Sequence, residues 1–135
     1  MGTRRTIAIG GVLALVAGVA LTGCAPQGAS VPSVATFRVV DEEFRIELVT
    51  PELVAHAEAL LRGEDVAAIP NGLVVRDDPS VNAPWSWHID PDDVEFADMT
   101  TEVCDGLPSF VEDGTVTSDR YCPWSAEIVS LEPVS

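Results

Sequence analysis

Residues 43–63 read EFRIELVTPELVAHAEALLRG and contain a strand-like hydrophobic pattern followed by a helix-like one. Apolar and charged residues alternate over the first six positions, which is the period of a strand with one buried face. Thr50 then suits the N-cap of a helix, Pro51 suits its first position, and Gly63 suits a left-handed C-terminal end. The stretch therefore predicts a half-buried strand followed by a helix over residues 51–62.

A second strand is predicted just before this stretch, because alternation also marks residues 35–39. Asp41 and Glu42 lie between the two runs. They form either the turn of a hairpin or a bulge within one long strand, and both alternatives are open from the sequence. The helix is expected to bury a stripe made of Leu53, Ala57, Leu60 and Leu61.

After the helix, turn-forming residues alternate with short apolar runs. We expect strands at residues 73–75, 85–89, 94–98 and 124–131, a turn at Asn71-Gly72, a tight turn at 90–93, a short helix at 107–113 and an exposed loop at 116–118. The pattern predicts an α+β fold in one small domain. Its sheet is mostly antiparallel, with one main helix at about 51–62 and a short second helix.

The N-terminal residues have the order of an export signal: two arginines, an uncharged apolar run, and the sequence Leu21-Thr22-Gly23-Cys24. This sequence resembles the lipobox of bacterial lipoproteins. The resemblance implies cleavage before Cys24 and a lipid on its thiol. The alternative is a membrane span, although the apolar run is shorter than the roughly 20 residues that a span needs. We expect a signal peptide at 1–23, a flexible tether at 24–34 and the domain at 35–135.

Charge limits the partners of the mature chain. All 22 acidic residues follow Cys24, and only five arginines do, which gives a net charge of −17; the chain has no lysine. Such a surface repels nucleic acids and anionic lipid headgroups. The acidity serves either solubility or the attraction of cations and basic partners, and the sequence leaves this choice open.

Lipidation of Cys24 would leave Cys104 and Cys122 as a pair. Outside the cytoplasm such a pair is expected to be oxidised to a disulfide. The alternative is a pair of metal-binding thiolates, but neither a CxxC spacing nor a neighbouring histidine supports it. We also expect Trp124, two residues after Cys122, to cover the bridge.

The most unusual segment is Trp85-Ser86-Trp87-His88-Ile89-Asp90. On a strand the two tryptophans would share one face, and the serine, histidine and aspartate the other. The first interpretation is a core strand with a hydrogen-bonded histidine. The second is a ligand-binding face made by Trp85, Trp87, His88 and Asp90. A small hydrolase using His88 and Asp90 is a third; these two side chains could touch, but Ser86 is short and would not readily converge on His88.

An acidic cluster follows, consisting of Asp90, Asp92, Asp93, Glu95 and Asp98. Carboxylates at this density suggest Ca²⁺, which prefers oxygen ligands. The EF-hand pattern fails, because its sixth position lacks glycine and its twelfth is Thr101. A solvated turn is the other interpretation. No further metal ligand or cofactor is predicted; on the helix, His56 is expected to pair with Glu52 at the surface.

Several motifs resemble a family of small secreted domains common in actinomycetes. They occupy residues 81–91, 94–98, 102–112 and 121–125 and include WSWHIDP, VEFAD, EVCDG and YCPW. The resemblance implies one compact domain with a Cys104–Cys122 bridge and transfers no catalytic residue. We therefore expect an extracytoplasmic lipoprotein on the cell membrane, held by the lipid on Cys24. Its domain would bind an envelope protein or a small ligand without catalysis; the alternatives are the hydrolase and a calcium-binding module.

Overall fold

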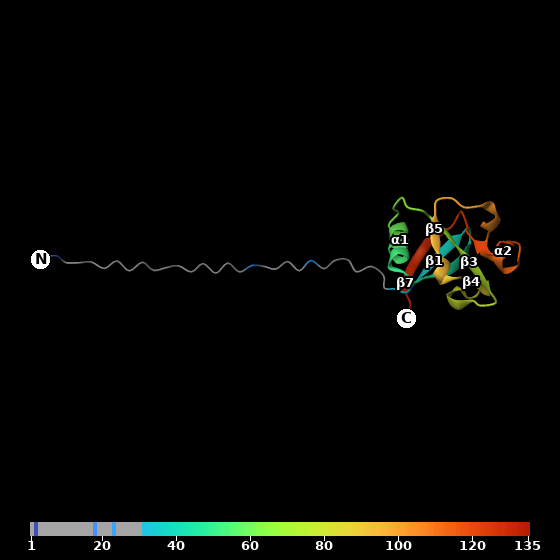
Figure 1. Ribbon diagram of the computed structural model, residues 1–135, viewed down its shortest axis with the longest axis horizontal. Helices are drawn as coiled ribbons and strands as arrows, with labels where there is room; N and C mark the ends of the chain where they lie inside the picture. Colours follow the sequence, from blue (N-terminus) through green and yellow to red (C-terminus); the bar gives the residue numbers. More distant parts are fainter. Residues whose placement is uncertain (1, 3–17, 19–22, 24–30) are drawn as a thin grey trace.

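The computed structural model describes residues 31–135 and, before them, only Gly2, Gly18 and Gly23. Cys24 and its predicted lipid therefore lie outside the described residues. From residue 33 onward the chain forms two small antiparallel sheets, one main helix and several short helical turns (Figure 1). Within the part of the chain that is described, no helix is long and apolar enough to cross a membrane.

The first sheet has the strand order β2-β1-β7. β1 (Ser33–Val39) and β2 (Glu42–Leu48) are antiparallel neighbours, with Val39 opposite Glu42. Val40 and Asp41 thus form a two-residue turn, so the hairpin is the correct alternative of the two. The last strand, β7 (Glu127–Pro133), pairs with the other edge of β1 and lies two to three residues later than predicted.

The helix α1 (Pro51–Leu61) begins as the sequence predicted. Thr50 Oγ1 accepts a hydrogen bond from the backbone N–H of Leu53, at 3.2 Å, and Gly63 has a φ of 74°. The buried stripe differs in part from the expected one. Val54, Ala57 and Ala59 are buried, Leu53 and Leu60 pack against the core, and Leu61 is exposed. The helix contacts β7, and its buried alanines, Ala57 and Ala59, are small enough to permit a close approach. Leu61, at the end of the helix, stays in solvent.

The second sheet is built on one long strand, β3 (Ile69–Arg76). Three short strands pair with it along its length: β5 (Glu95–Ala97), β6 (Arg120–Tyr121) and β4 (Trp87–Ile89). The predicted turn at Asn71-Gly72 is wrong, because both residues lie inside β3. A side chain at Gly72 would overlap Ile89 Cγ2 and approach the Asp93 carbonyl oxygen, so this glycine permits close packing.

The core lies between the two sheets and is rich in aromatic side chains. Phe37 and Phe44 stack with ring centroids 5.7 Å apart, and Tyr121 meets both Phe44 and Trp87 edge-on. Val116 also belongs to this core, being only 5% exposed. The prediction of an exposed loop at residues 116–118 is therefore wrong at its first position. The polar neighbours Thr115, Thr117 and Ser118 favoured an exposed loop, although Val116 itself packs inward.

Short helical segments join the strands: η1 (Ser80–Asn82), η2 (Pro91–Asp93), η3 (Glu102–Cys104) and α2 (Pro108–Glu112). The disulfide between Cys104 and Cys122 ties η3 to the residue that follows β6. Antiparallel sheets, one main helix, one short helix and this bridge confirm the predicted α+β fold.

Candidate functional site

The two tryptophans of the 85–90 segment have structural contacts. Trp87 is 1% exposed and packs in the aromatic core, where its Nε1–H has no hydrogen-bond partner among the described atoms. Trp85 precedes β4, and its Nε1–H donates to the Glu43 carbonyl oxygen at 2.8 Å. Trp85 therefore joins the segment to β2, and Trp87 is not accessible from solvent.

His88 and Asp90 are each held by their own neighbours. His88 Nδ1 lies 2.6 Å from the Asp78 carbonyl oxygen, and the histidine side chain is only 12% exposed. Asp90 Oδ1 accepts from the backbone N–H of Asp92 and so caps η2. The backbone N–H of Ser86 donates to Glu112. None of the contacts found in residues 31–135 links Ser86, His88 and Asp90 into the chain of hydrogen bonds that a nucleophile and its base require.

Two carboxylates of the acidic cluster are neutralised by Arg120. The guanidinium donates to Asp93 Oδ2 at 2.7 Å and lies 3.8 Å from Glu95 Oε1. Asn71, only 8% exposed, accepts from Arg120 and donates to Glu95, and Asp93 also accepts from the Leu73 N–H. Arg120 thus links β6 to η2 and β5 through these partners. The described residues hold no group of three potential metal ligands, and calcium at this cluster stays a prediction.

His56 faces inward from α1 instead of meeting solvent. Its ring stacks on Phe96 with centroids 4.4 Å apart and an interplanar angle of 6°, and its Nε2 lies 2.6 Å from the Ala67 carbonyl oxygen. These contacts attach the loop after the helix to α1. The histidine is therefore a packing residue between α1 and β5.

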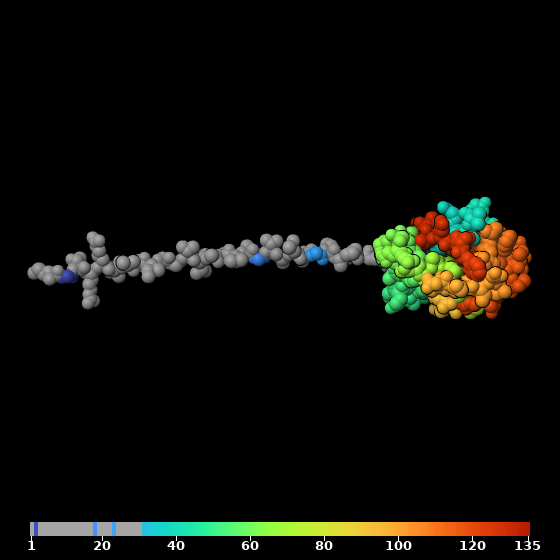
Figure 2. All heavy atoms as spheres, turned by 90° about the horizontal axis from the view of Figure 1, so that it is seen from above, coloured from blue at the N-terminus to red at the C-terminus, as the bar shows by residue number. Residues whose placement is uncertain are grey.

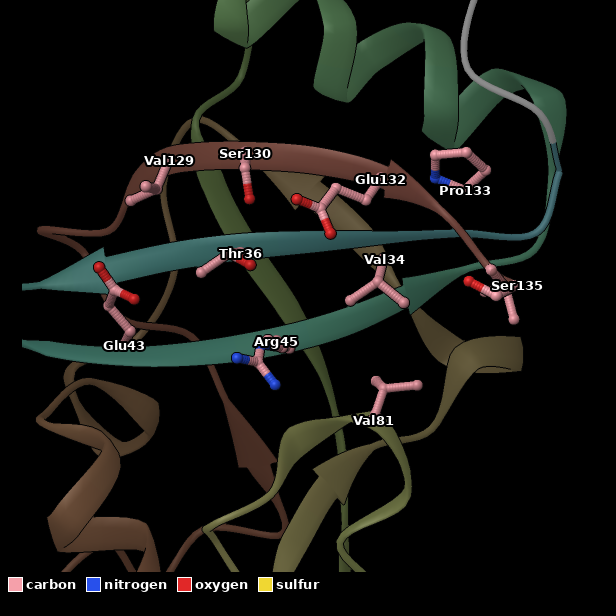
Figure 3. A pocket seen from close by; sticks show the side chains of 11 residues that line it. Val34, Thr36, Glu43, Arg45, Val81, Val129, Ser130, Glu132, Pro133 and Ser135 are labelled. Atoms are coloured by element: carbon pink, nitrogen blue, oxygen red, sulfur yellow. The ribbon is translucent and has the colours of Figure 1, made fainter.

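A shallow hollow of about 520 Å³ lies over the outward face of the first sheet (Figure 3). Ser130, Thr36 and Arg45 follow one another across β7, β1 and β2, in the registers Ser130–Thr36 and Thr36–Arg45. Val81 closes one side. No interaction described for residues 31–135 engages the Arg45 guanidinium. The hollow is polar and open, and Glu43 and Glu132 in its lining counteract the one positive charge.

A second pocket, of about 340 Å³, gathers residues far apart in the sequence: Ile69, Asp98, Met99, Thr100 and Trp124. Trp124, which we expected to cover the disulfide, is 45% exposed. Its Nε1–H donates to Thr100 Oγ1 at 2.6 Å, and its backbone N–H donates to Asp105 Oδ1 at 2.8 Å. One hydrogen bond thus holds the indole and the other holds the backbone of the same residue, while the ring remains partly open to solvent.

Two other exposed apolar side chains lie just before Cys104 in the sequence. Met99 is 84% exposed and Val103, one residue before Cys104, is 70% exposed. Figure 2 shows the segments concerned, drawn in light green, orange and red, meeting on the face seen from above. Sequence reasoning missed this pocket, whose only sequence signal was a tryptophan near a cysteine.

Tyr121 is buried and contacts the loop that contains Asp105 and Gly106. Its hydroxyl donates to the Gly106 carbonyl oxygen at 2.8 Å, and its ring is fully buried. Burial, and after it the carboxylates of Asp105 and Glu42, raise the pKa of the tyrosine far above its usual value. Tyr121 therefore stays protonated and fixes the loop that carries Asp105, the partner of Trp124.

The family of the chain follows from a family model, described as the BP-74 N-terminal domain, that matches residues 32–135. The chain belongs to the BP-74 N-terminal domain family. The match covers β1 to β7 and therefore the whole of the described domain. Neither the curated proteins nor the solved structures contain a match to this chain.

Proposed function

We propose that this member of the BP-74 N-terminal domain family is an extracytoplasmic lipoprotein whose domain binds a protein partner. The export signal and the lipobox-like Leu21-Thr22-Gly23-Cys24 support the location on the membrane. Two or more acyl chains on Cys24 would anchor the protein stably, since each buried CH₂ contributes about 0.8 kcal/mol. Binding, with no chemical step, is the activity that the arrangement of the surface favours.

The observation that carries the binding proposal is Trp124. Trp124 is 45% exposed, yet one hydrogen bond already holds its indole and a second holds its backbone, so the side chain loses little entropy when a partner covers it. Rigid tryptophans of this kind dominate the energetics of many interfaces. With the other residues that line its pocket, Ile69, Asp98, Met99 and Thr100, it forms the Trp124 surface, named so from here on.

The Trp124 surface also lies away from the point where the chain enters the domain. The N–H of Val134 donates to the Pro32 carbonyl oxygen, so the start of β1 and the end of β7 are neighbours. In Figure 1 these ends lie at the bottom of the domain, whereas the orange segment after β5 crosses its top. A tether attached at residue 32 would present the Trp124 surface to the space beyond the membrane.

The anchor is tested by the variant Cys24→Ala. Without the thiol no lipid can be attached, so we expect the variant to move from the membrane fraction to the soluble envelope fraction. Mass spectrometry of the wild-type protein should find the lipid on Cys24 as its N-terminal residue. Equal membrane retention of wild type and variant would contradict the proposed anchor.

The binding surface is tested by site-specific photo-crosslinking in intact cells. A photoreactive phenylalanine analogue at Met99 should give one discrete adduct with an envelope protein. The matched control is the same analogue at Val40, which is 72% exposed at the far turn of the β1–β2 hairpin and should give no adduct. Absence of an adduct at position 99, or the same adduct at both positions, would contradict the proposed surface.

A further inference from the structure

The pocket beside Trp124 combines an aromatic face with a carboxylate that has no cation of its own. Asp98 lines the pocket together with Trp124, Ile69 and Met99. No hydrogen bond or ion pair described for residues 31–135 involves the Asp98 side chain. A carboxylate next to an aromatic face is attractive to a positive group, because both direct negative potential to the same space.

The arginines of the domain do not supply that positive group. Arg38 and Arg62 pair with Glu43 and Glu64, and Arg76 donates to the carbonyl oxygens of Val111 and Val116. Arg120 is engaged by Asp93 and Glu95, and Arg45 lies on the outward face of the first sheet. The positive charge at the pocket must therefore come from a partner.

The hydrogen bond of the indole N–H limits how the Trp124 ring can contact a ligand. Trp124 Nε1–H is already used by Thr100, so the exposed part of the ring offers its face and its apolar edge. Ile69 and Met99 provide apolar walls that suit the aliphatic stem of a long side chain. The exposed carboxylate of Glu102, in η3 next to Val103, adds to the negative potential of the same part of the chain.

We propose that this pocket receives an arginine or lysine side chain of the protein partner. The cationic head lies over the face of Trp124 and beside the Asp98 carboxylate, and the stem packs on Ile69 and Met99. This inference rests on the proposed function, because it names what the partner presents to the Trp124 surface. It also gives the net charge of −17 on residues 24–135 a role in attracting that partner.

The probe is a short glycine-spaced peptide with two arginines, compared with the same peptide in which citrulline, an uncharged isostere, replaces both. It is titrated into the full lipidated protein in detergent micelles. The signals of the three indole N–H groups are followed by nuclear magnetic resonance. We expect the arginine peptide to shift the Trp124 signal, while the Trp85 and Trp87 signals stay in place and serve as internal references. The citrulline peptide should shift none of them.

The paired variants are Asp98→Asn and Asp77→Asn, which remove the same charge from two exposed aspartates. Asp98→Asn should weaken binding of the arginine peptide about two- to fivefold, the range of a solvent-exposed ion pair, and Asp77→Asn should leave it unchanged. Equal shifts with arginine and citrulline, or equal weakening by both variants, would overturn the cation site. If the adduct at position 99 still formed in that case, the binding surface would stand without the cation. If the peptide bound as expected but no adduct formed, the cation site would stand and the proposed function would fail.

Discussion

Val40 occupies a backbone conformation that suits glycine. Its φ is 61° at the tip of the β1–β2 hairpin, where its side chain is 72% exposed. A residue other than glycine in this region costs about 1–2 kcal/mol, and branching at Cβ adds to the crowding. Glycine would relieve this strain but would lose more freedom on folding. We expect Val40→Gly to stabilise the domain by about 0.5–1 kcal/mol.

Denaturant unfolding measures this effect, with Val129→Gly as the matched control. Val129 is also an exposed valine, but it lies within β7 and is not among the residues with positive φ. Glycine there should destabilise the domain, since it only adds freedom to the unfolded chain. A loss of stability in both variants would contradict the strain at Val40.

The raised pKa of Tyr121 predicts that the free energy of unfolding falls at alkaline pH. Its pKa is raised in the folded protein, so the folded state keeps a proton that the unfolded state releases. The stability from this group is therefore complete below the unfolded pKa of about 10 and falls as the pH rises above it. The chain has one tyrosine and no lysine, so few other groups titrate there. Denaturation midpoints are measured at increasing pH while the absorbance of tyrosinate is recorded. We expect Tyr121 to ionise only as the domain unfolds. Ionisation of Tyr121 in the folded domain near the usual tyrosine pKa would contradict this prediction.

At the scale of elements, Asn82 joins the two sheets. It is 1% exposed, accepts from the backbone N–H of Arg45 on β2 at 2.8 Å and donates to the Trp87 carbonyl oxygen on β4 at 2.8 Å. With Trp85 on the Glu43 carbonyl, it covers an edge of β2 that would otherwise be open. Asn82→Ala leaves both backbone groups without a partner, and we expect a loss of about 2–4 kcal/mol.

Thermal and denaturant unfolding of Asn82→Ala and Asn82→Asp would check this role. The aspartate keeps the acceptor for Arg45 but places a buried carboxylate oxygen against the Trp87 carbonyl oxygen, so its stability should fall at least as far as that of the alanine variant. If both variants unfold like wild type, the asparagine does not hold the sheets together.

Local patterns predicted the elements whose partners are near in sequence. The alternation in β1 and β2 and the caps of α1 were sufficient, because they record burial and backbone geometry at single residues. Asn71-Gly72 misled, since the same dipeptide that favours a turn also permits the close approach of β3 to Ile89 and Asp93. The pocket could not be predicted, because Ile69, Met99 and Trp124 meet only through the pairing of β3 with β5 and β6.

At the scale of the whole molecule, the domain has two distinct ends. One end carries the neighbouring chain segments at Pro32 and Val134. The Trp124 surface lies on the part braced by the Cys104–Cys122 bridge, the Arg120 contacts and the Tyr121 hydroxyl. This bracing keeps the exposed tryptophan in one position. In the function that we propose, the tether is attached at the first end and the partner is recognised at the second.

The central claim is that Trp124 anchors the partner, and it is tested by adding Trp124→Ala to the protein with the photoreactive residue at position 99. Because a central tryptophan contributes about 2 kcal/mol or more to many interfaces, we expect the adduct to fall at least roughly tenfold. The thermal unfolding of the variant should remain close to that of the parent, since the side chain is half exposed. An undiminished adduct from the folded Trp124→Ala protein would contradict the account.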